Sequence, residues 1–130
     1  MRKLKLPDRG KDRPRLGEKD IQMIRDLGVS TMKDQARQIV EMKLKEQPEN
    51  DGFQTPSAGN PVYRAMHACH VDSRKNLSQT HRIPAGRDLK EDEIDAVVNL
   101  IVRWIVREYN FFIEEKEEQQ RSLSEFSKTA

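Results

Sequence analysis

The sequence predicts an all-α protein with one small core and a long C-terminal helix. Apolar residues recur every three or four positions through most of the chain, which is the spacing that places them on one face of a helix. The segments between are rich in proline, glycine and asparagine, which are typical of turns and helix ends. At 130 residues, the chain is long enough for one core but not for two.

Composition indicates a small core with a large solvated surface. Hydrophobic and charged residues each make up 35% of the chain, and the mean hydropathy is −0.91. No run approaches the ~20 apolar residues of a transmembrane helix. The N-terminal residues lack the apolar centre of a secretory signal, and a single cysteine cannot form an intramolecular disulfide. We therefore expect a cytoplasmic protein without a membrane partner.

Positive charge is concentrated at the N-terminus. The net charge of the chain is +2, but residues 2–15 hold seven lysines and arginines against two aspartates. We expect residues 1–16 to be a basic flexible arm. Such an arm binds phosphate groups through counterion release, whatever the base sequence. The alternative is a disordered tail that serves solubility.

The next segment predicts a helical hairpin. Residues 17–27 carry apolar side chains at helical spacing, and Gly28 is a typical stop signal. Ser30 is a good N-cap for a second helix over residues 31–46, which has one continuous apolar stripe.

The centre of the chain predicts a loop followed by short helices. Residues 47–60 have the composition of a loop, with Phe53 as the apolar residue that we expect to hold it to the core. The pair Asn60–Pro61 indicates an N-cap and the first turn of a short helix. Asp72 or Ser73 is placed to cap another.

The strongest helical pattern begins near residue 90 and continues to residue 113. Its β-branched residues would suit a strand, but its periodicity and length favour a helix, because strands rarely exceed ~10 residues. This helix completes a domain over residues 17–113, and residues 114–130 form an acidic and polar tail that continues it. Apolar residues also lie off its main stripe, so we expect a homo-oligomer in which another copy covers this second side. These residues are Leu100, Val102, Val106, Phe111 and Ile113.

Four segments resemble a bacterial family known as domain of unknown function 4186. They read NDGFQTP, GNPVYRAMHA, HRIPAGRDL and EIDAVVNLIVRWI, and the resemblance extends from about Leu16 to about Arg107. It implies a small, mostly helical domain with a cluster of cysteines and histidines. It implies no particular activity.

The chain departs from that family pattern at its cysteines. His67 and His81 match the family's histidines, and Thr80 replaces the tryptophan that usually precedes the second one. Where the family has cysteines, this chain has Asp72, Ser73 and Asn76.

The remaining candidate ligands suggest a metal site. His67 and His70 share a helical face if the helix continues between them. With Asp72 and His81 they would suit zinc or another divalent metal in a catalytic or exchangeable site. The alternative is that loss of the three soft ligands abolished the site and that polar interactions or packing fill the gap. Cys69 lies on an apolar face, which favours a buried structural cysteine over a nucleophile.

Basic residues in the same region suggest phosphate recognition, because arginine binds phosphate oxygens with two parallel hydrogen bonds. Few aromatic residues lie nearby, so base stacking is poorly supplied. The alternative is that these cations pair with acidic residues and cap loop carbonyls; the acidic residues are Asp72, Asp88, Glu91 and Asp92. The candidates are Arg64, Arg74, Lys75, Arg82 and Arg87.

The sequence as a whole favours a non-enzymatic binding or regulatory protein without a cofactor. We expect it to engage nucleic acid or a protein partner through the arm and the Arg/Lys cluster. The alternative function is a metal-binding module or a metal-dependent hydrolase that uses the His/Asp cluster.

Overall fold

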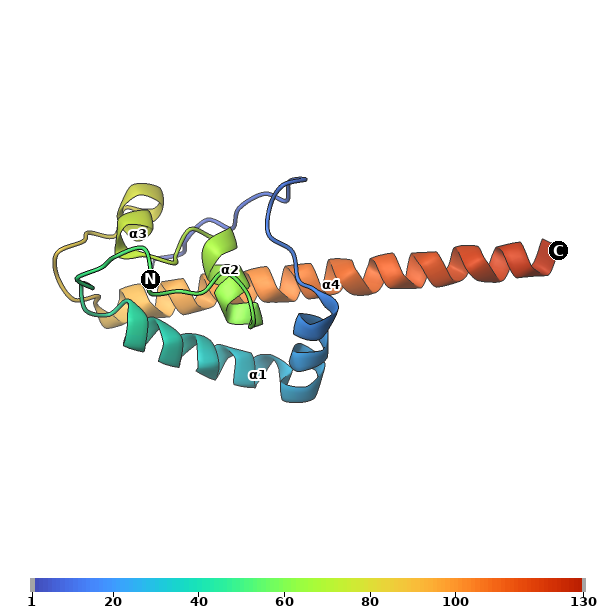
Figure 1. Cartoon of the computed structure of the whole chain (residues 1–130), viewed down its shortest axis with the longest axis horizontal. Coiled ribbons are helices and arrows are strands. Elements are labelled where there is room, and N and C mark those ends of the chain that lie inside the picture. Colours follow the sequence, from blue (N-terminus) through green and yellow to red (C-terminus); the bar gives the residue numbers. More distant parts are fainter. Residues whose placement is uncertain (1, 130) are drawn as a thin grey trace.

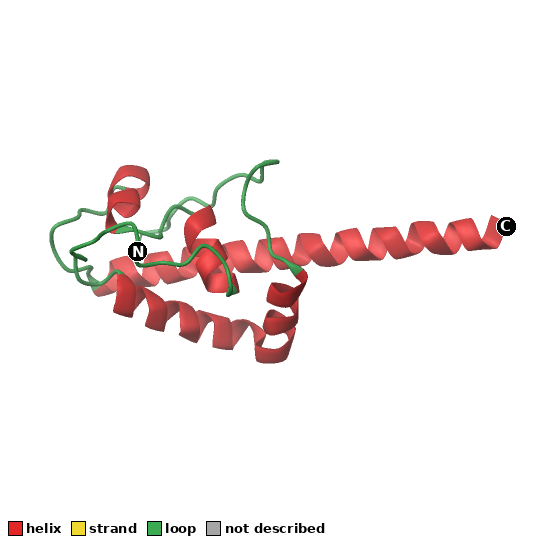
Figure 2. Cartoon of the chain, viewed as in Figure 1, coloured by secondary structure: helices red, strands yellow, loops and turns green. Residues whose placement is uncertain are grey.

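A computed structural model describes residues 2–129 of the protein, with side chains through residue 123, and its regular structure there is entirely helical (Figure 2). The elements are α1 (Glu18–Lys43), α2 (Pro61–Ala68), α3 (Arg74–His81) and α4 (Glu91–Thr129). α1 and α4 pack on each other, and α2 packs on both (Figure 1). The predicted all-α fold, with short central helices and a long last helix, is confirmed. Met1 and Ala130, at the ends of the predicted arm and tail, lie outside the described residues.

α1 bends at Gly28, where the backbone has φ +84° and ψ +161°. Glycine tolerates this conformation because it has no Cβ. The predicted hairpin therefore takes the form of one bent helix, whose two segments meet at an angle (Figure 1). Ser30 lies within helical geometry and not at a cap. The first segment reaches the middle of α4, where Arg25 donates a hydrogen bond to the Tyr109 hydroxyl.

The short helices begin where their capping residues predict. The Asn60 side chain accepts a hydrogen bond from the backbone N–H of Val62 at 2.7 Å, and Pro61 occupies the first turn of α2. The Ser73 hydroxyl accepts one from the N–H of Asn76 at 3.0 Å at the start of α3. Both caps satisfy amide groups that have no partner within the helix.

The loop before α2 is held by polar contacts and not by Phe53. The Phe53 side chain is 90% exposed, so the prediction that it anchors the loop is wrong. The Asp51 carboxylate instead accepts hydrogen bonds from the backbone N–H groups of Arg74 and Lys75, each at 2.8 Å. This carboxylate joins the loop to the first turn of α3.

The N-terminal segment lies along α4, so its description as a flexible arm needs correction. Leu4 and Leu16 are only 5% and 7% exposed. The arm contacts α4 in order, from Arg2 at Glu93 to Arg9 at Glu108. Seven extended residues span about 23 Å, and fifteen helical residues span about 22 Å. An extended arm therefore matches this stretch of α4 in length.

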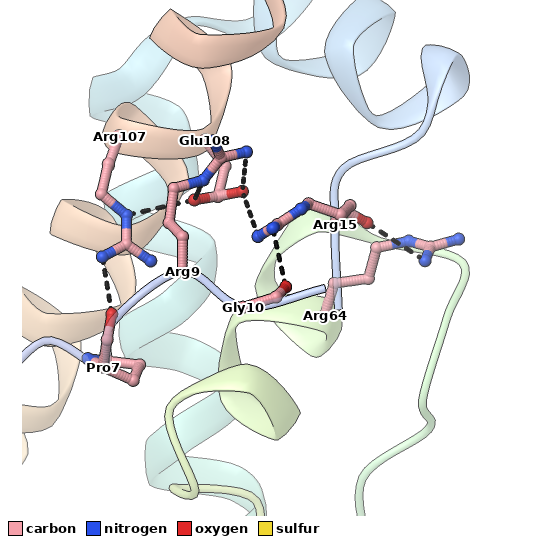
Figure 3. A network of polar contacts seen from close by, with 7 residues as sticks. All are labelled: Pro7, Arg9, Gly10, Arg15, Arg64, Arg107 and Glu108. Atoms are coloured by element: carbon pink, nitrogen blue, oxygen red, sulfur yellow. Dashed lines mark hydrogen bonds and ion pairs between the residues drawn. The ribbon is translucent and has the colours of Figure 1, made fainter. Parts of the chain in front are cut away.

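A buried carboxylate fixes the arm in place (Figure 3). Glu108 is 2% exposed and accepts hydrogen bonds from Arg9 at 2.9 and 3.1 Å, from Arg15 at 3.3 Å and from Arg107 at 3.1 Å. The Arg9 guanidinium also stacks on the Phe111 ring at 3.8 Å. A carboxylate is buried only when opposite charges and hydrogen bonds compensate it. Two of its three arginines come from the arm.

The arm occupies much of the side of α4 that the sequence assigned to another copy. Arg103 and Arg107 of α4 donate hydrogen bonds to the carbonyl groups of Leu4 and Pro7. Leu100 is fully buried within the single chain, which makes its assignment to an oligomer interface wrong. Val106 and Phe111 stay 36% and 37% exposed, and self-association through them stays a prediction.

Arg74 is completely buried and joins three parts of the chain. Its guanidinium donates hydrogen bonds to the carbonyl groups of Leu44 at 3.1 Å, Lys45 at 3.2 Å and Pro84 at 2.8 Å. The first two carbonyls lie at the end of α1, where helical partners are missing. Burial lowers the pKa of Arg74, and its hydrogen bonds fix the ends of α1 and α3 relative to each other.

Arg87 and Glu93 form a second fixed pair at the start of α4. Arg87 donates two hydrogen bonds of 2.8 Å to the Glu93 carboxylate, which also accepts one from the Lys90 N–H at 2.8 Å. Hydrogen bonding from Arg87 is the main reason that the pKa of Glu93 falls to about 2.

We predict that Arg74→Ala lowers the free energy of unfolding by about 3–5 kcal/mol, because it leaves three carbonyl groups without their donor. Urea unfolding followed by circular dichroism measures this loss. Arg82→Ala is the matched control, since Arg82 is an exposed arginine, and we expect it to change stability by less than about 0.5 kcal/mol. Equal effects of the two substitutions would contradict the structural role of Arg74.

We predict that Glu93 stabilises the fold in a pH-dependent way. Its pKa in the folded protein, about 2, lies below the ordinary value of 4.5, so its contribution is present above pH 4.5 and is lost as the pH falls toward 2. At neutral pH, Glu93→Gln should cost on the order of 2–3 kcal/mol relative to the wild type. The test compares unfolding free energies at pH 7 and pH 3. A difference that does not shrink at pH 3 would contradict the assignment, and Glu91→Gln, at an exposed position, is the control.

Candidate nucleic-acid interface

A cationic cleft lies between the arm and the ends of α2 and α3. Its volume is about 290 Å³. Lys5 and Arg13 of the arm are exposed and form no ion pair with any described residue. The cleft therefore contains two permanent positive charges, on Lys5 and Arg13, and one carboxylate, on Asp8. The lining residues are Lys5, Pro7, Asp8, Arg13, Cys69, His70, Thr80 and His81.

Two of the predicted metal ligands, His70 and His81, line this cleft. His70 has a φ of +57°, a left-handed conformation that is uncommon for residues other than glycine. His81 Nε2 lies 2.8 Å from the Cys69 carbonyl oxygen. A carbonyl only accepts hydrogen bonds, so Nε2 carries the hydrogen and donates it. This contact fixes the His81 ring beside the turn that presents His70.

The other two predicted ligands, His67 and Asp72, pair with each other. His67 Nδ1 lies 3.3 Å from an Asp72 carboxylate oxygen, and its Nε2 lies 2.9 Å from the Thr55 carbonyl oxygen. The second Asp72 oxygen accepts a hydrogen bond from the Asn76 side chain at 2.8 Å. Both ring nitrogens of His67 are therefore occupied by protein acceptors.

The geometry does not gather the four residues into one metal site. α2 ends at Ala68, so His67 and His70 do not share a helical face as the sequence predicted. No group of three or more His, Cys, Asp or Glu side chains that could hold a metal occurs in the described part of the chain. In addition, Lys5 and Arg13 would repel a cation beside His70 and His81. The metal assignment stays a prediction that gains no geometric support.

Cys69 is buried beneath the cleft, as the sequence predicted. Its side chain is 1% exposed, and burial raises the pKa of the thiol to about 12. The thiolate is the reactive form of cysteine. A thiol with so high a pKa stays protonated and unreactive near neutral pH.

Three of the five predicted phosphate ligands serve the fold instead. Arg74 is buried without access to a ligand, and Arg87 is paired with Glu93. Arg64 Nε lies 2.6 Å from an Asp20 carboxylate oxygen. Arg87 and Arg64 thus pair with acidic residues as the alternative expected, although their partners, Glu93 and Asp20, differ from those named. Arg74 instead binds carbonyl groups, which that alternative also included.

Lys75 and Arg82 stay predicted phosphate ligands. Both are exposed and form no ion pair with described residues. Arg82 ends α3 in the left-handed conformation, with φ +58°, and directly follows His81 of the cleft.

Sequence reasoning missed Lys5 and Arg13 as members of this site. The signal that could have found Lys5 is the alternation of Leu4 and Leu6 with exposed lysines. Such alternation is typical of an extended segment with one buried face. Leu4 is buried and Leu6 packs against the core, so the intervening lysine points to solvent.

Comparisons with known proteins identify the family of the chain. None of the described helices combines the length and apolar character needed to cross a bilayer, and no solved structure matches the chain. The family model described as Domain of unknown function (DUF4186) matches residues 4–106. The match begins at Leu4, the first buried residue of the arm, and ends within α4. The chain therefore belongs to the family of domain of unknown function 4186.

Proposed function

We propose that this protein is a non-enzymatic nucleic-acid-binding protein that holds the phosphate backbone in the cleft between the arm and the ends of α2 and α3. The observation that carries this proposal is the fixed position of two unpaired cations. The docked arm places Lys5 and Arg13 in one cleft with His70 and His81.

The electrostatics of the cleft suit phosphate oxygens. Lysine and arginine that neutralise backbone phosphates release condensed counterions, which provides most of the affinity of sequence-independent binding. Arg13 offers a guanidinium fork for two phosphate oxygens, and the Thr80 hydroxyl is exposed beside it. Further exposed cations extend this surface along the arm and α3. They are Lys11, Lys75 and Arg82.

The chemistry of the cleft favours nucleic acid over an apolar protein surface. Its exposed lining is polar and cationic, whereas the exposed large apolar side chains Met42, Phe53 and Leu123 do not line it. Tyr63, the aromatic residue that the sequence places nearest, is half-buried against the core. Recognition should therefore depend on the backbone and not on stacked bases.

We predict that Lys5→Gln combined with Arg13→Gln weakens binding of a labelled oligonucleotide by about tenfold and reduces the salt slope by about 1.5, because two phosphate contacts are lost. Fluorescence anisotropy at several salt concentrations measures both quantities, for a single strand and for a duplex.

The matched control is Lys19→Gln combined with Lys45→Gln. It removes two exposed cations outside the cleft, and we expect less than a twofold change. Equal losses in the two double variants would show that only net charge matters. Absence of binding by the wild type at low salt, to either strand form, would reject the function.

A further inference from the structure

The C-terminal part of α4 extends beyond the rest of the molecule (Figure 1) and beyond the family match, which ends at residue 106. Every side chain from residue 114 to residue 120 is exposed. Four of them are glutamates that form no ion pair with any described residue. We call residues 114–123 the acidic extension; its glutamates are Glu114, Glu115, Glu117 and Glu118, and its cations are Lys116, which pairs with Glu18, and Arg121.

A cationic groove lies at the opposite end of α4, between the arm, α1 and α4. Its volume is about 620 Å³. Lys3 and Lys33 are exposed and have no ion-pair partner among the described residues. Arg2 pairs with Glu93, and Arg37 pairs with Glu41, Glu91 and Asp95. The two unpaired lysines supply the free positive charge of the groove, and its floor is formed by Ala96 and Val98, which are only 4% and 1% exposed. The lining residues are Arg2, Lys3, Lys33, Arg37, Asp95, Ala96, Val98 and Asn99.

We propose that this groove binds the acidic extension of a second copy of the chain. The two surfaces are complementary in charge, which steers association and selects the register of contact. The inference does not depend on nucleic-acid binding, because the groove and the cleft share no lining residue.

The extension cannot reach the groove of its own chain. Both lie on the same continuous helix, with the groove at residues 95–99 and the extension beginning at residue 114. A helix rises 1.5 Å per residue, so at least about 22 Å of rigid helix separates them. Contact therefore requires another molecule.

Symmetric pairing of two extensions is disfavoured. Each extension carries four glutamates against Lys116 and Arg121, so two extensions side by side would both be net negative, and like charges at close range are destabilising. A helical pair also needs apolar residues at regular positions along its seam, but Leu123 is the one large aliphatic side chain within residues 114–123. A single contact of extension to groove is heterologous and leaves one free groove and one free extension, so further copies can add.

Sedimentation velocity of the full chain tests this inference. At low salt the wild type should form species that grow past the dimer as its concentration rises, and high salt should return it to monomer because charge attraction is screened. Two variants remove one surface each. The groove variant is Lys3→Gln/Lys33→Gln, and the extension variant is Glu114→Gln/Glu115→Gln/Glu117→Gln/Glu118→Gln.

Each variant alone should lose self-association by about tenfold or more. An equal mixture of the two should form a one-to-one heterodimer and nothing larger, because one intact groove meets one intact extension. All substituted side chains are exposed, so circular dichroism should show no change in folding, and Lys19→Gln/Lys45→Gln should associate like the wild type. The inference is overturned if the wild type stays monomeric at low salt, if the groove variant associates as strongly as the wild type, or if the mixture stays monomeric.

Discussion

The structure depends on the buried carboxylate of Glu108 and the three guanidinium groups around it. Without Arg9 and Arg15 from the arm, Glu108 would be buried with Arg107 as its one partner. Without Glu108, the same arginines would repel one another at close range. Burial of Leu4 adds an apolar contribution of about 2 kcal/mol. The arm is therefore part of the domain, which agrees with a family match that begins at residue 4.

The basic residues of the chain fall into two classes: those that hold the fold and those that point to solvent beside the arm. Buried or paired cations such as Arg9, Arg74 and Arg87 hold the fold through hydrogen bonds within the protein. Unpaired cations point outward on either side of the arm: Lys5 enters the cleft beside α2 and α3, and Lys3 enters the groove beside α1 and α4. One extended segment thus supplies both proposed binding surfaces, and neither surface would exist if the arm were free.

The sequence predicted the helices and their ends more accurately than the contacts between distant parts of the chain. Helical periodicity, the caps Asn60 and Ser73 and the break at Gly28 are local signals, and the structure follows them. The two partners of Glu108 from the arm are 93 and 99 residues away along the chain, so no local pattern relates them to Glu108. Arg74 and Arg82 look alike in sequence, and only packing against the end of α1 buries the first. The left-handed turn at His70 separates it from His67, which removed the common face on which the metal hypothesis depended.

The most direct test of the docked arm is nucleic-acid binding by Glu108→Gln, at a temperature where circular dichroism shows that the variant is folded. This substitution removes a negative charge and no cation. If the arm acted as a free basic tail, affinity should stay equal or increase, because the chain becomes more positive. We predict instead that affinity falls several-fold, because releasing the arm separates Lys5 and Arg13 from His70 and His81. Binding as tight as that of the wild type, or tighter, would contradict the claim that a fixed arm builds the site.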